Sequence, residues 1–488
     1  MDPCYMSATA LAVEIARGRI SAIEALDHCL ARVEAKNPAI NAIVGSDIEA
    51  ARADASGADA ARACGKTLGP LHGVPTTVKE SFDLAGFPST FGRPERRDHR
   101  ATRDALAVER LKAAGAIVFG KSNVPKDLAD WQSFNEIHGD TVNPWDASRT
   151  PGGSSGGAAA ALATGMAALE FGSDIGGSIR IPAHCCGVYG HKPTFGIVPL
   201  RGHAFSPDDA DSDILVGGPL ARSAQDLALA LDLTAGADLE AGSAWLLDLP
   251  REPRGSLRDF SIAVVTDDPR YPVDADTQAA LDNAADFLAA EGAQVVRDPV
   301  LPMPSEELWL LYLGLLRGAT SARLTDEDAG AAVARAAATD SADLGYGAVM
   351  LRALGQSHHQ WLRANDRRAY LRNRWREFFG GMDALITPMM ATAAFPHIRG
   401  VAKQDQQLDV DGTMRPISDT YYWIGLASVT GLPATVAPAG ASRDGLPIGL
   451  QIVGPEFHDR RCLKLAGFLE QGFRKFVPPP EEAYRQGP

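Results

Sequence analysis

Residues 151–180 read Pro151-Gly-Gly-Ser-Ser-Gly-Gly-Ala-Ala-Ala-Ala-Leu-Ala-Thr-Gly-Met-Ala-Ala-Leu-Glu-Phe-Gly-Ser-Asp-Ile-Gly-Gly-Ser-Ile-Arg180. The small apolar residues over 158–164 predict a helix, and the apolar run over 167–171 predicts a buried strand directly after it. The stretch also places two serines, Ser154 and Ser178, each directly after a pair of glycines. Because glycine adopts positive φ and leaves backbone N–H groups accessible to a ligand, both hydroxyls are suited to chemistry at a carbonyl group.

The order of a helix followed by a strand recurs along the chain. Further helix-and-strand pairs are predicted at 102–114 with 116–119, 277–290 with 293–296, and 361–379 with 382–387. This alternation predicts an α/β fold with a large mixed, mostly parallel twisted sheet covered by helices on both faces. We expect a single domain over residues 1–488, with a variable cap at about 300–360.

Three local signals sharpen this prediction. Ser21 and Glu24 are spaced as a capping box for a helix that continues to Lys36. The Asp-Gly pair within 409–413 predicts a hairpin turn. The apolar stretch Gly73-Val-Pro-Thr-Thr-Val78 predicts a short strand, which places Lys79 inside the sheet rather than on a solvated helix face.

Charge and composition exclude several classes of function. The 488 residues carry a net charge of −14, which disfavours nucleic acid as a partner because phosphate binding depends on clustered Lys and Arg. The N-terminal residues lack the basic and apolar regions of a signal peptide, and no run of apolar residues is long enough for a membrane span. The six cysteines show no CxxC spacing and predict a reducing, cytoplasmic compartment. The segment Asn135-Glu-Ile-His138 fails the HExxH pattern, so we expect neither a metal nor a cofactor.

The glycine–serine segment fits two common motifs poorly. A phosphate-binding loop needs Gly-Lys-Ser or Gly-Lys-Thr at its end, but here Gly157 is followed by Ala158. Residues 152–156 match the G-x-S-x-G pattern of a nucleophile elbow, which must follow a buried strand directly. The preceding residues 143–151 are instead typical of a loop.

A third interpretation uses both serines together with Lys79. Ser178 needs a base, and no histidine pairs obviously with an aspartate in this sequence. A lysine can serve if desolvation holds it neutral, well below its ordinary pKa of about 10.4, and Ser154 could then relay the proton. Two plainer interpretations stay open: a solvated lysine at a strand end, and Ser154 as the N-cap of the helix that follows.

These residues resemble the amidase signature family. Its GGSSGG segment matches residues 152–157, its D-x-G-G-S-x-R segment matches 174–180, and its lysine matches Lys79. The likeness covers nearly the whole chain, through Asn143-Pro-Trp-Asp146, Gly190-His-Lys-Pro-Thr194, Gly431-Leu-Pro-Ala434 and Gly445-Leu-Pro-Ile-Gly-Leu-Gln451. The resemblance implies the amidase signature fold with a signature core at about 70–200, and hydrolysis of the C–N bond of a linear carboxamide.

The resemblance also implies a Ser–cis-Ser–Lys triad. Ser178 would be the acylated nucleophile, Ser154 the relay after a cis peptide bond, and Lys79 the base. The oxyanion hole would be formed by the backbone amides of Ile175, Gly176, Gly177 and Ser178. Supporting roles fall to Ser155, which would hydrogen-bond within the network, and to an ion pair of Asp174 with Arg180.

Two subclasses share this pattern. We expect a free-standing bacterial-type amidase that acts on a small-molecule amide; the alternative is the glutamine-hydrolysing subunit of a tRNA-dependent amidotransferase. Such subunits usually continue after the lysine with Asp, whereas this chain has Glu80. They also carry an arginine shortly before a Met-Leu pair, whereas Gly347-Ala348 precede Met350-Leu351 here.

The substrate is less defined by the sequence. The resemblance implies that Trp131, Phe134 and Asn135 line the acyl pocket, which would favour aryl or alkyl amides, with esters or carbamates as further substrates. The plainer alternative is that these are ordinary core residues. Weaker candidates are Trp309, Tyr312, Trp423, Arg317, His358 and His359. A homodimer is an expectation from the family.

Overall fold

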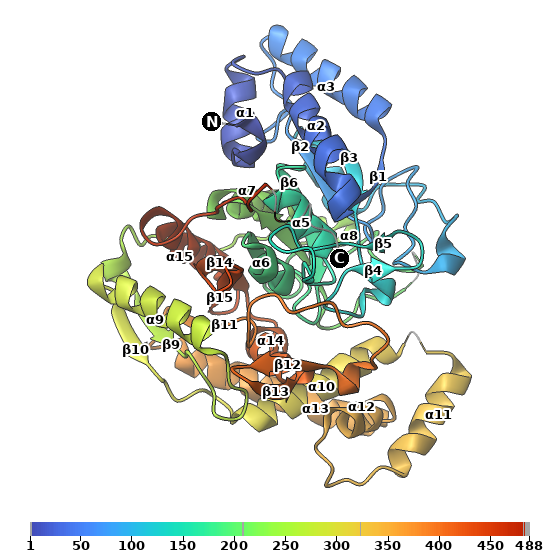
Figure 1. The fold of residues 1–488 in the computed structure, drawn as a ribbon, viewed down its shortest axis with the longest axis vertical. Helices are drawn as coiled ribbons and strands as arrows, with labels where there is room; N and C mark the ends of the chain where they lie inside the picture. The colour runs from blue at the N-terminus through green and yellow to red at the C-terminus, as the bar shows by residue number, and fades with distance from the viewer. Residues whose placement is uncertain (1, 207–208, 323, 482, 484–488) are drawn as a thin grey trace.

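The computed structural model describes residues 2–206, 209–322, 324–481 and 483. Within these residues an eleven-stranded sheet runs through the molecule in the order β1-β3-β2-β6-β8-β7-β14-β15-β11-β9-β10 (Figure 1). Its strands are β1 (Ile43–Ser46), β2 (Pro75–Lys79), β3 (Ile117–Ser122), β6 (Leu169–Asp174), β7 (Tyr189–Lys192), β8 (Val216–Ala221), β9 (Ser261–Val264), β10 (Gln294–Arg297), β11 (Ala384–Pro388), β14 (Ala434–Ala441) and β15 (Pro447–Val453).

The sheet is mixed, as predicted, but it is not mostly parallel. Parallel pairing is confined to β3–β2–β6 near one end and to β11–β9–β10 at the other. Between them, each successive pair in the run β6, β8, β7, β14, β15, β11 is antiparallel. The alternation of helices and strands suggested parallel crossovers, but β14 and β15 are joined by a short turn, which forces an antiparallel pair.

Side chains alternate across the sheet and build a core on each face. Along β9, Ile262 and Val264 belong to one buried cluster, while Ala263 belongs to the other. Along β11, Ile386 belongs to the same cluster as Ile262, and Leu385 belongs to the same cluster as Ala263. This alternation follows from the two-residue period of a strand, and apolar residues at both phases require helices on both faces.

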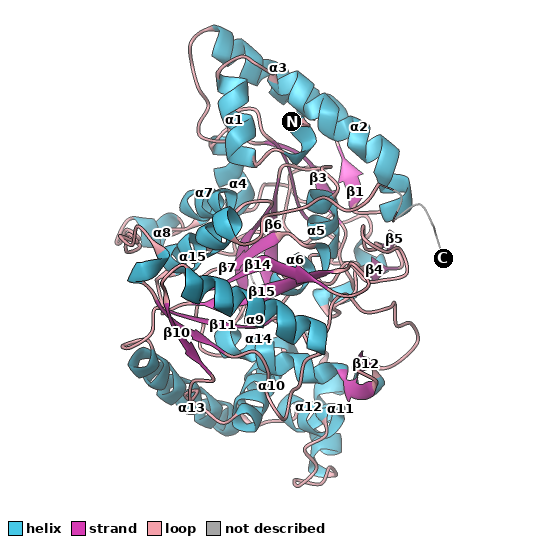
Figure 2. Cartoon of the chain, turned by 60° about the vertical axis from the view of Figure 1, so that its left-hand side comes forward, coloured by secondary structure: helices cyan, strands magenta, loops and turns pink. Residues whose placement is uncertain are grey.

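Helices cover both faces, which confirms the predicted α/β class. One core contains side chains from α1–α4, α7, α9 and α15, and the other from α6, α10 and α12–α14, while α5 contributes to both. Figure 2 shows the strands enclosed between these helices, with α10–α13 at the opposite end from α1–α3. The helices are α1 (Ala8–Ala16), α2 (Ala22–Ile40), α3 (Ile48–Ala63), α4 (Leu106–Ala113), α5 (Gly156–Ala163), α6 (Arg180–Cys186), α7 (Ala224–Thr234), α8 (Leu239–Gly242), α9 (Ala275–Ala290), α10 (Ser305–Ser321), α11 (Asp326–Ala337), α12 (Tyr346–Leu354), α13 (His358–Phe378), α14 (Thr420–Ser428) and α15 (Asp459–Gly472).

The local signals are confirmed. Ser21 caps α2, and Glu24 completes the capping box by accepting from the Ser21 backbone N–H at 2.7 Å. A hairpin of β12 (Gln407–Val410) and β13 (Thr413–Pro416) turns at Asp411 and Gly412, both at positive φ. A second small sheet pairs β4 (Phe134–Asn135) with β5 (Gly139–Asp140). Among the described residues, no helix has the length and apolar character needed to cross a membrane.

Candidate active site

Lys79 lies at the carboxyl end of β2, beside the end of the parallel strand β6. Val78 pairs with Phe171 in this register, so the next residues of both strands meet at the same edge of the sheet. Lys79 has no exposed surface, and its Nζ donates to Ser154 Oγ at 2.7 Å and to Ser173 Oγ at 3.0 Å. The lysine is therefore buried among hydroxyls, and the interpretation of a solvated strand-end lysine is wrong.

Burial changes the proton affinity of this amine. Desolvation lowers the pKa of Lys79 from 10.5 to about 7, although the nearby carboxylates of Asp174 and Glu80 favour its charged form. A substantial fraction of Lys79 is consequently neutral near pH 7. A neutral amine can accept a proton from a hydroxyl, so Lys79 is a candidate base.

Ser154 is held by close backbone packing in the loop before α5. The Gly153–Ser154 peptide bond is cis, as the family resemblance implies. A Cβ at Gly153 would lie 2.4 Å from the carbonyl oxygen of Asp130, so only glycine fits beside this neighbouring segment. The residue at the N-cap of α5 is Ser155, not Ser154, and its side chain makes no capping hydrogen bond.

Ser155 hydrogen-bonds to the neighbouring Ser178 segment through its backbone. Its backbone N–H donates to the carbonyl oxygen of Ser178 at 3.1 Å, which ties the loop before α5 to the turn after β6. Its hydroxyl, however, finds no hydrogen-bond partner among the residues that the structure describes. The hydrogen bond that Ser155 makes within the network therefore comes from its backbone and not from its side chain.

Asp174 and Arg180 form the predicted ion pair beneath the turn that carries Ser178. Both are fully buried, and Arg180 contacts the carboxylate through Nε at 3.0 Å and Nη2 at 2.9 Å. Burial alone would raise the pKa of Asp174, but the Arg180 charge and the hydrogen bonds outweigh it and hold that pKa below its usual value. The carboxylate also accepts from the backbone N–H groups of Gly177 at 2.9 Å and Ile179 at 3.1 Å. The pair thus fixes the turn from below.

This geometry corrects one member of the predicted oxyanion hole. The N–H of Gly177 donates to Asp174, and Gly177 is not among the residues that line the cavity. Ile175, Gly176 and Ser178 do line the cavity. Their positions leave these three backbone amides as the candidate donors.

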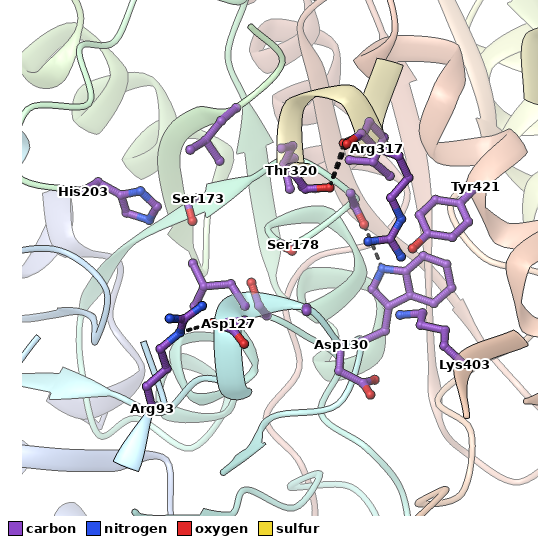
Figure 3. A pocket seen from close by; sticks show the side chains of 18 of the residues that line it. Arg93, Asp127, Asp130, Ser173, Ser178, His203, Arg317, Thr320, Lys403 and Tyr421 are labelled. Atoms are coloured by element: carbon purple, nitrogen blue, oxygen red, sulfur yellow. Dashed lines mark hydrogen bonds and ion pairs between the residues drawn. The ribbon is translucent and has the colours of Figure 1, made fainter. Parts of the chain in front are cut away.

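A cavity of about 270 Å³ opens above Ser154, Ser173 and Ser178. Figure 3 shows Arg317, Tyr421 and Lys403 on one side of Ser178, with Arg93 and His203 on the opposite side. No hydrogen bond joins the hydroxyls of Ser154 and Ser178 within the described part of the chain; both simply border the same cavity. The lining residues are Arg93, Asp127, Leu128, Ala129, Asp130, Trp131, Ser154, Ser173, Ile175, Gly176, Ser178, His203, Leu215, Leu316, Arg317, Thr320, Leu324, Lys403 and Tyr421.

Comparison with known proteins shows the family of this chain. The family described as Amidase matches residues 24–463, which is most of the chain. The chain belongs to the amidase signature family. An indoleacetamide hydrolase from Bradyrhizobium diazoefficiens is 33% identical over 469 residues, covering 95% of this chain and 86% of that protein.

Other relatives include amidotransferase subunits and solved structures. A glutamyl-tRNA(Gln) amidotransferase subunit from Chloroflexus aggregans is 32% identical over 480 residues, with 94% and 95% of the two chains covered. Among solved structures, a chain from a vestigial protein complex linked to the evolutionary origins of an s-triazine catabolic enzyme has a TM-score of 0.81. The solved chain is 31% identical to this one, and the match covers 97% of this chain and 100% of the solved chain.

The predicted substrate-binding residues of this amidase divide into one that lines the cavity and two that do not. Trp131 lines it, and its Nε1 donates to the carbonyl oxygen of Gly176 at 2.8 Å. The guanidinium carbon of Arg399 lies 4.0 Å from the centroid of the Phe134 ring, and Phe134 does not line the cavity. Asn135 holds its own loop, donating to Asn123 and Val124 and accepting from the N–H groups of Ile137 and His138. Neither residue lines the cavity, because Phe134 packs against Arg399 and Asn135 hydrogen-bonds within its own loop, so both predictions are wrong.

The weaker candidates also divide. Arg317 lines the cavity, whereas Trp309, Trp423, His358 and His359 do not. Tyr312 does not line the cavity, but its hydroxyl donates to the carbonyl oxygen of the lining residue Ile175 at 2.6 Å.

Sequence reasoning missed Ser173, Asp130, Lys403 and Tyr421, which all line the cavity of this amidase. Ser173 had a usable signal, since it is the last residue but one of β6, the strand that runs parallel to the strand of Lys79. Lys403 and Tyr421 come from distant segments, and no spacing in the sequence connects them to the signature motifs.

Proposed function

We propose that this chain hydrolyses the C–N bond of small-molecule amides through an acyl-Ser178 intermediate, with Lys79 as base and Ser154 as proton relay. The observation that carries the proposal is the fully buried Lys79 amine, which lies 2.7 Å from the hydroxyl of Ser154. Ser154 in turn borders the same cavity as Ser178. A strongly lowered pKa beside a cavity is a frequent mark of a catalytic group.

The proton path runs from Ser178 to Ser154 and on to Lys79. Rotation of the Ser154 and Ser178 hydroxyls about their side-chain bonds brings them together when substrate is bound, since catalytic hydrogen bonds commonly tighten in the substrate complex. Ser178 Oγ then attacks the carbonyl carbon as its proton passes to Ser154 and the proton of Ser154 passes to Lys79. The backbone N–H groups of Ile175, Gly176 and Ser178 stabilise the oxyanion, and each such donor is worth about 10²–10³ in rate.

The second half of the reaction reverses the proton path. Lys79 returns its proton through Ser154 to the leaving nitrogen, the C–N bond breaks, and the amine departs from an ester of Ser178. Water then attacks the ester carbon while its proton passes to Lys79. The bond from that carbon to Ser178 Oγ breaks, Ser178 regains the proton from Lys79 through Ser154, and the acid is released. Esters and carbamates offer the same carbonyl carbon, so we include them as further substrates.

One relative also favours the second candidate function, a glutamine-hydrolysing subunit of an amidotransferase. A glutamyl-tRNA(Gln) amidotransferase subunit matches the chain over 94% of its length, which favours testing glutamine hydrolysis inside a complex. Glutaminase activity, or co-purification with an amidotransferase partner, would support this candidate. Ammonia release from simple amides by the purified chain alone supports the free-standing amidase.

We further propose a cytoplasmic enzyme, because all six cysteines are free thiols. A homodimer is the expected assembly, and light scattering measures it directly.

The test compares Ser178→Ala and Lys79→Ala with a matched control, Ser341→Ala, at an exposed position. The substrates are anilides, aliphatic amides, amino-acid amides and carbamates, and circular dichroism checks that each variant is folded. Both active-site variants are expected to lose hydrolysis, whereas the control keeps it. Full activity in a well-folded Ser178→Ala protein would overturn the proposal.

A further inference from the structure

Two cationic side chains share one wall of the active-site cavity. Arg317 projects from α10, and Lys403 begins the short helix η5 (Lys403–Asp405). Both line the cavity together with Tyr421 and Trp131, and Figure 3 shows Arg317, Tyr421 and Lys403 on the same side of Ser178. Cations beside aromatic rings in a concave site are suited to binding a charged ligand group.

Arg317 has a hydrogen-bond donor that no other described residue uses. Its Nε is buried without a hydrogen-bond partner, and within the described residues its guanidinium forms no ion pair. The other buried or half-buried arginines near the site are neutralised: Arg180 pairs with Asp174, and Arg93 pairs with Asp127. Arg317 as a whole is half-buried, but a buried donor without a partner, such as its Nε, costs free energy that a bound anion would recover.

Lys403 adds a second positive charge to the same wall. Its Nζ lies 4.2 Å from the centroid of the Trp131 ring. Desolvation lowers the pKa of Lys403, and the charge of Arg317 lowers it further. Asp130 and Tyr346 oppose this effect. Asp130 offers a single carboxylate, which accepts from the Gln132 backbone N–H at 3.1 Å and, in the described structure, forms no ion pair with either cation. The wall therefore carries more positive than negative charge.

We propose that Arg317 and Lys403 bind a carboxylate of the substrate, so that the preferred substrates are amides that carry a carboxylate. The inference rests on the proposed function, because Ser178 marks where the amide carbonyl must lie. A carboxylate fits the planar fork of an arginine through two parallel hydrogen bonds, and the Lys403 ammonium adds a second charged donor. The simplest substrates of this class are primary amides of dicarboxylic acids, which release ammonia.

The binding test uses the Ser178→Ala protein and isothermal titration calorimetry. Glutaramate is compared with valeramide, which has the same chain with a methyl group in place of the carboxylate. Hydrogen bonds to charged groups predict that glutaramate binds about tenfold to hundredfold more tightly. Adding Arg317→Met or Lys403→Met should remove most of this preference, whereas Arg335→Met, exposed on the neighbouring helix α11, should keep it. Asp130→Asn should increase the affinity for glutaramate, a gain that a structural role alone does not produce.

Turnover by the wild-type chain separates this inference from the proposed function. Ammonia release from glutaramate is expected to exceed that from valeramide in kcat/KM by a similar factor. Equal affinity for the two amides, no binding of glutaramate, or an equal loss for both amides in Arg317→Met would overturn the carboxylate site. If valeramide were hydrolysed by a route that needs Ser178 and showed no such preference, the amidase function would stand and the inference would fail.

Discussion

Replacing Lys79 by methionine is expected to abolish hydrolysis and at the same time to stabilise the fold. The buried amine has a pKa of about 7 instead of 10.5, so between these values the unfolded chain binds more protons than the folded chain. The difference corresponds to on the order of 5 kcal/mol of unfolding free energy. This destabilisation is present in full below about pH 7 and disappears as the pH rises above about 10.5.

Methionine removes the titrating group but keeps most of the volume of the side chain. It also removes the hydrogen bonds to Ser154 and Ser173, which offsets about 2–3 kcal/mol of the gain. We therefore expect a net stabilisation on the order of 2 kcal/mol at pH 7, shrinking or reversing toward pH 10.

The measurement is urea unfolding of the wild-type and Lys79→Met proteins at both pH values. The control is Lys66→Met, at an exposed position, for which no pH-dependent difference is expected. A Lys79→Met protein that is less stable at pH 7, that gains the same stability at pH 10, or that keeps its activity would show that the buried amine does not act in this way.

Three further outcomes are expected. Asp174→Asn leaves its buried arginine partner uncompensated, and calorimetry should show a loss of about 3–5 kcal/mol together with lost activity. Gly153→Ala places a Cβ 2.4 Å from a backbone carbonyl oxygen and should abolish activity, whereas Gly314→Ala, with open space in α10, should keep activity and stabilise by up to about 1 kcal/mol; activity assays with thermal unfolding check both. Trp131→Ala should change the ranking of an amide panel, and Phe134→Ala should leave that ranking unchanged.

Local signals in the sequence predicted the elements well where neighbouring residues determine the structure. The capping box at Ser21 and Glu24 and the hairpin at Asp411 and Gly412 depend on residues within a few positions of each other, and both are present. The helix expected to begin at residue 102 begins instead at Leu106. The reason is tertiary, because the N–H groups of 105 and 106 donate to the carbonyl oxygens of residues 83 and 201.

The residues of the candidate site also differ in how well the sequence predicts them. Lys79, Ser154 and Ser178 lie on or beside two adjacent parallel strands, so a strand prediction with the two glycine pairs was enough to bring them together. Which side chains of 121–138 face the cavity depends on the loop conformation, and a sequence carries no period from which to read it. Lys403 reaches the wall from a loop in the last fifth of the chain, which only the folded arrangement reveals.

Transfer of an acyl group to Ser178, driven by deprotonated Lys79, is measured most directly by trapping the acyl-enzyme. A slowly hydrolysed para-nitrophenyl ester is mixed with the enzyme across about pH 5–9, and the quenched protein is mapped by peptide mass spectrometry. We expect one acyl group, on Ser178, forming at a rate that rises with pH and levels off above about pH 7. An acyl group on Ser154, or a rate of labelling that does not change through pH 7, would rule out Lys79 as the base that activates Ser178.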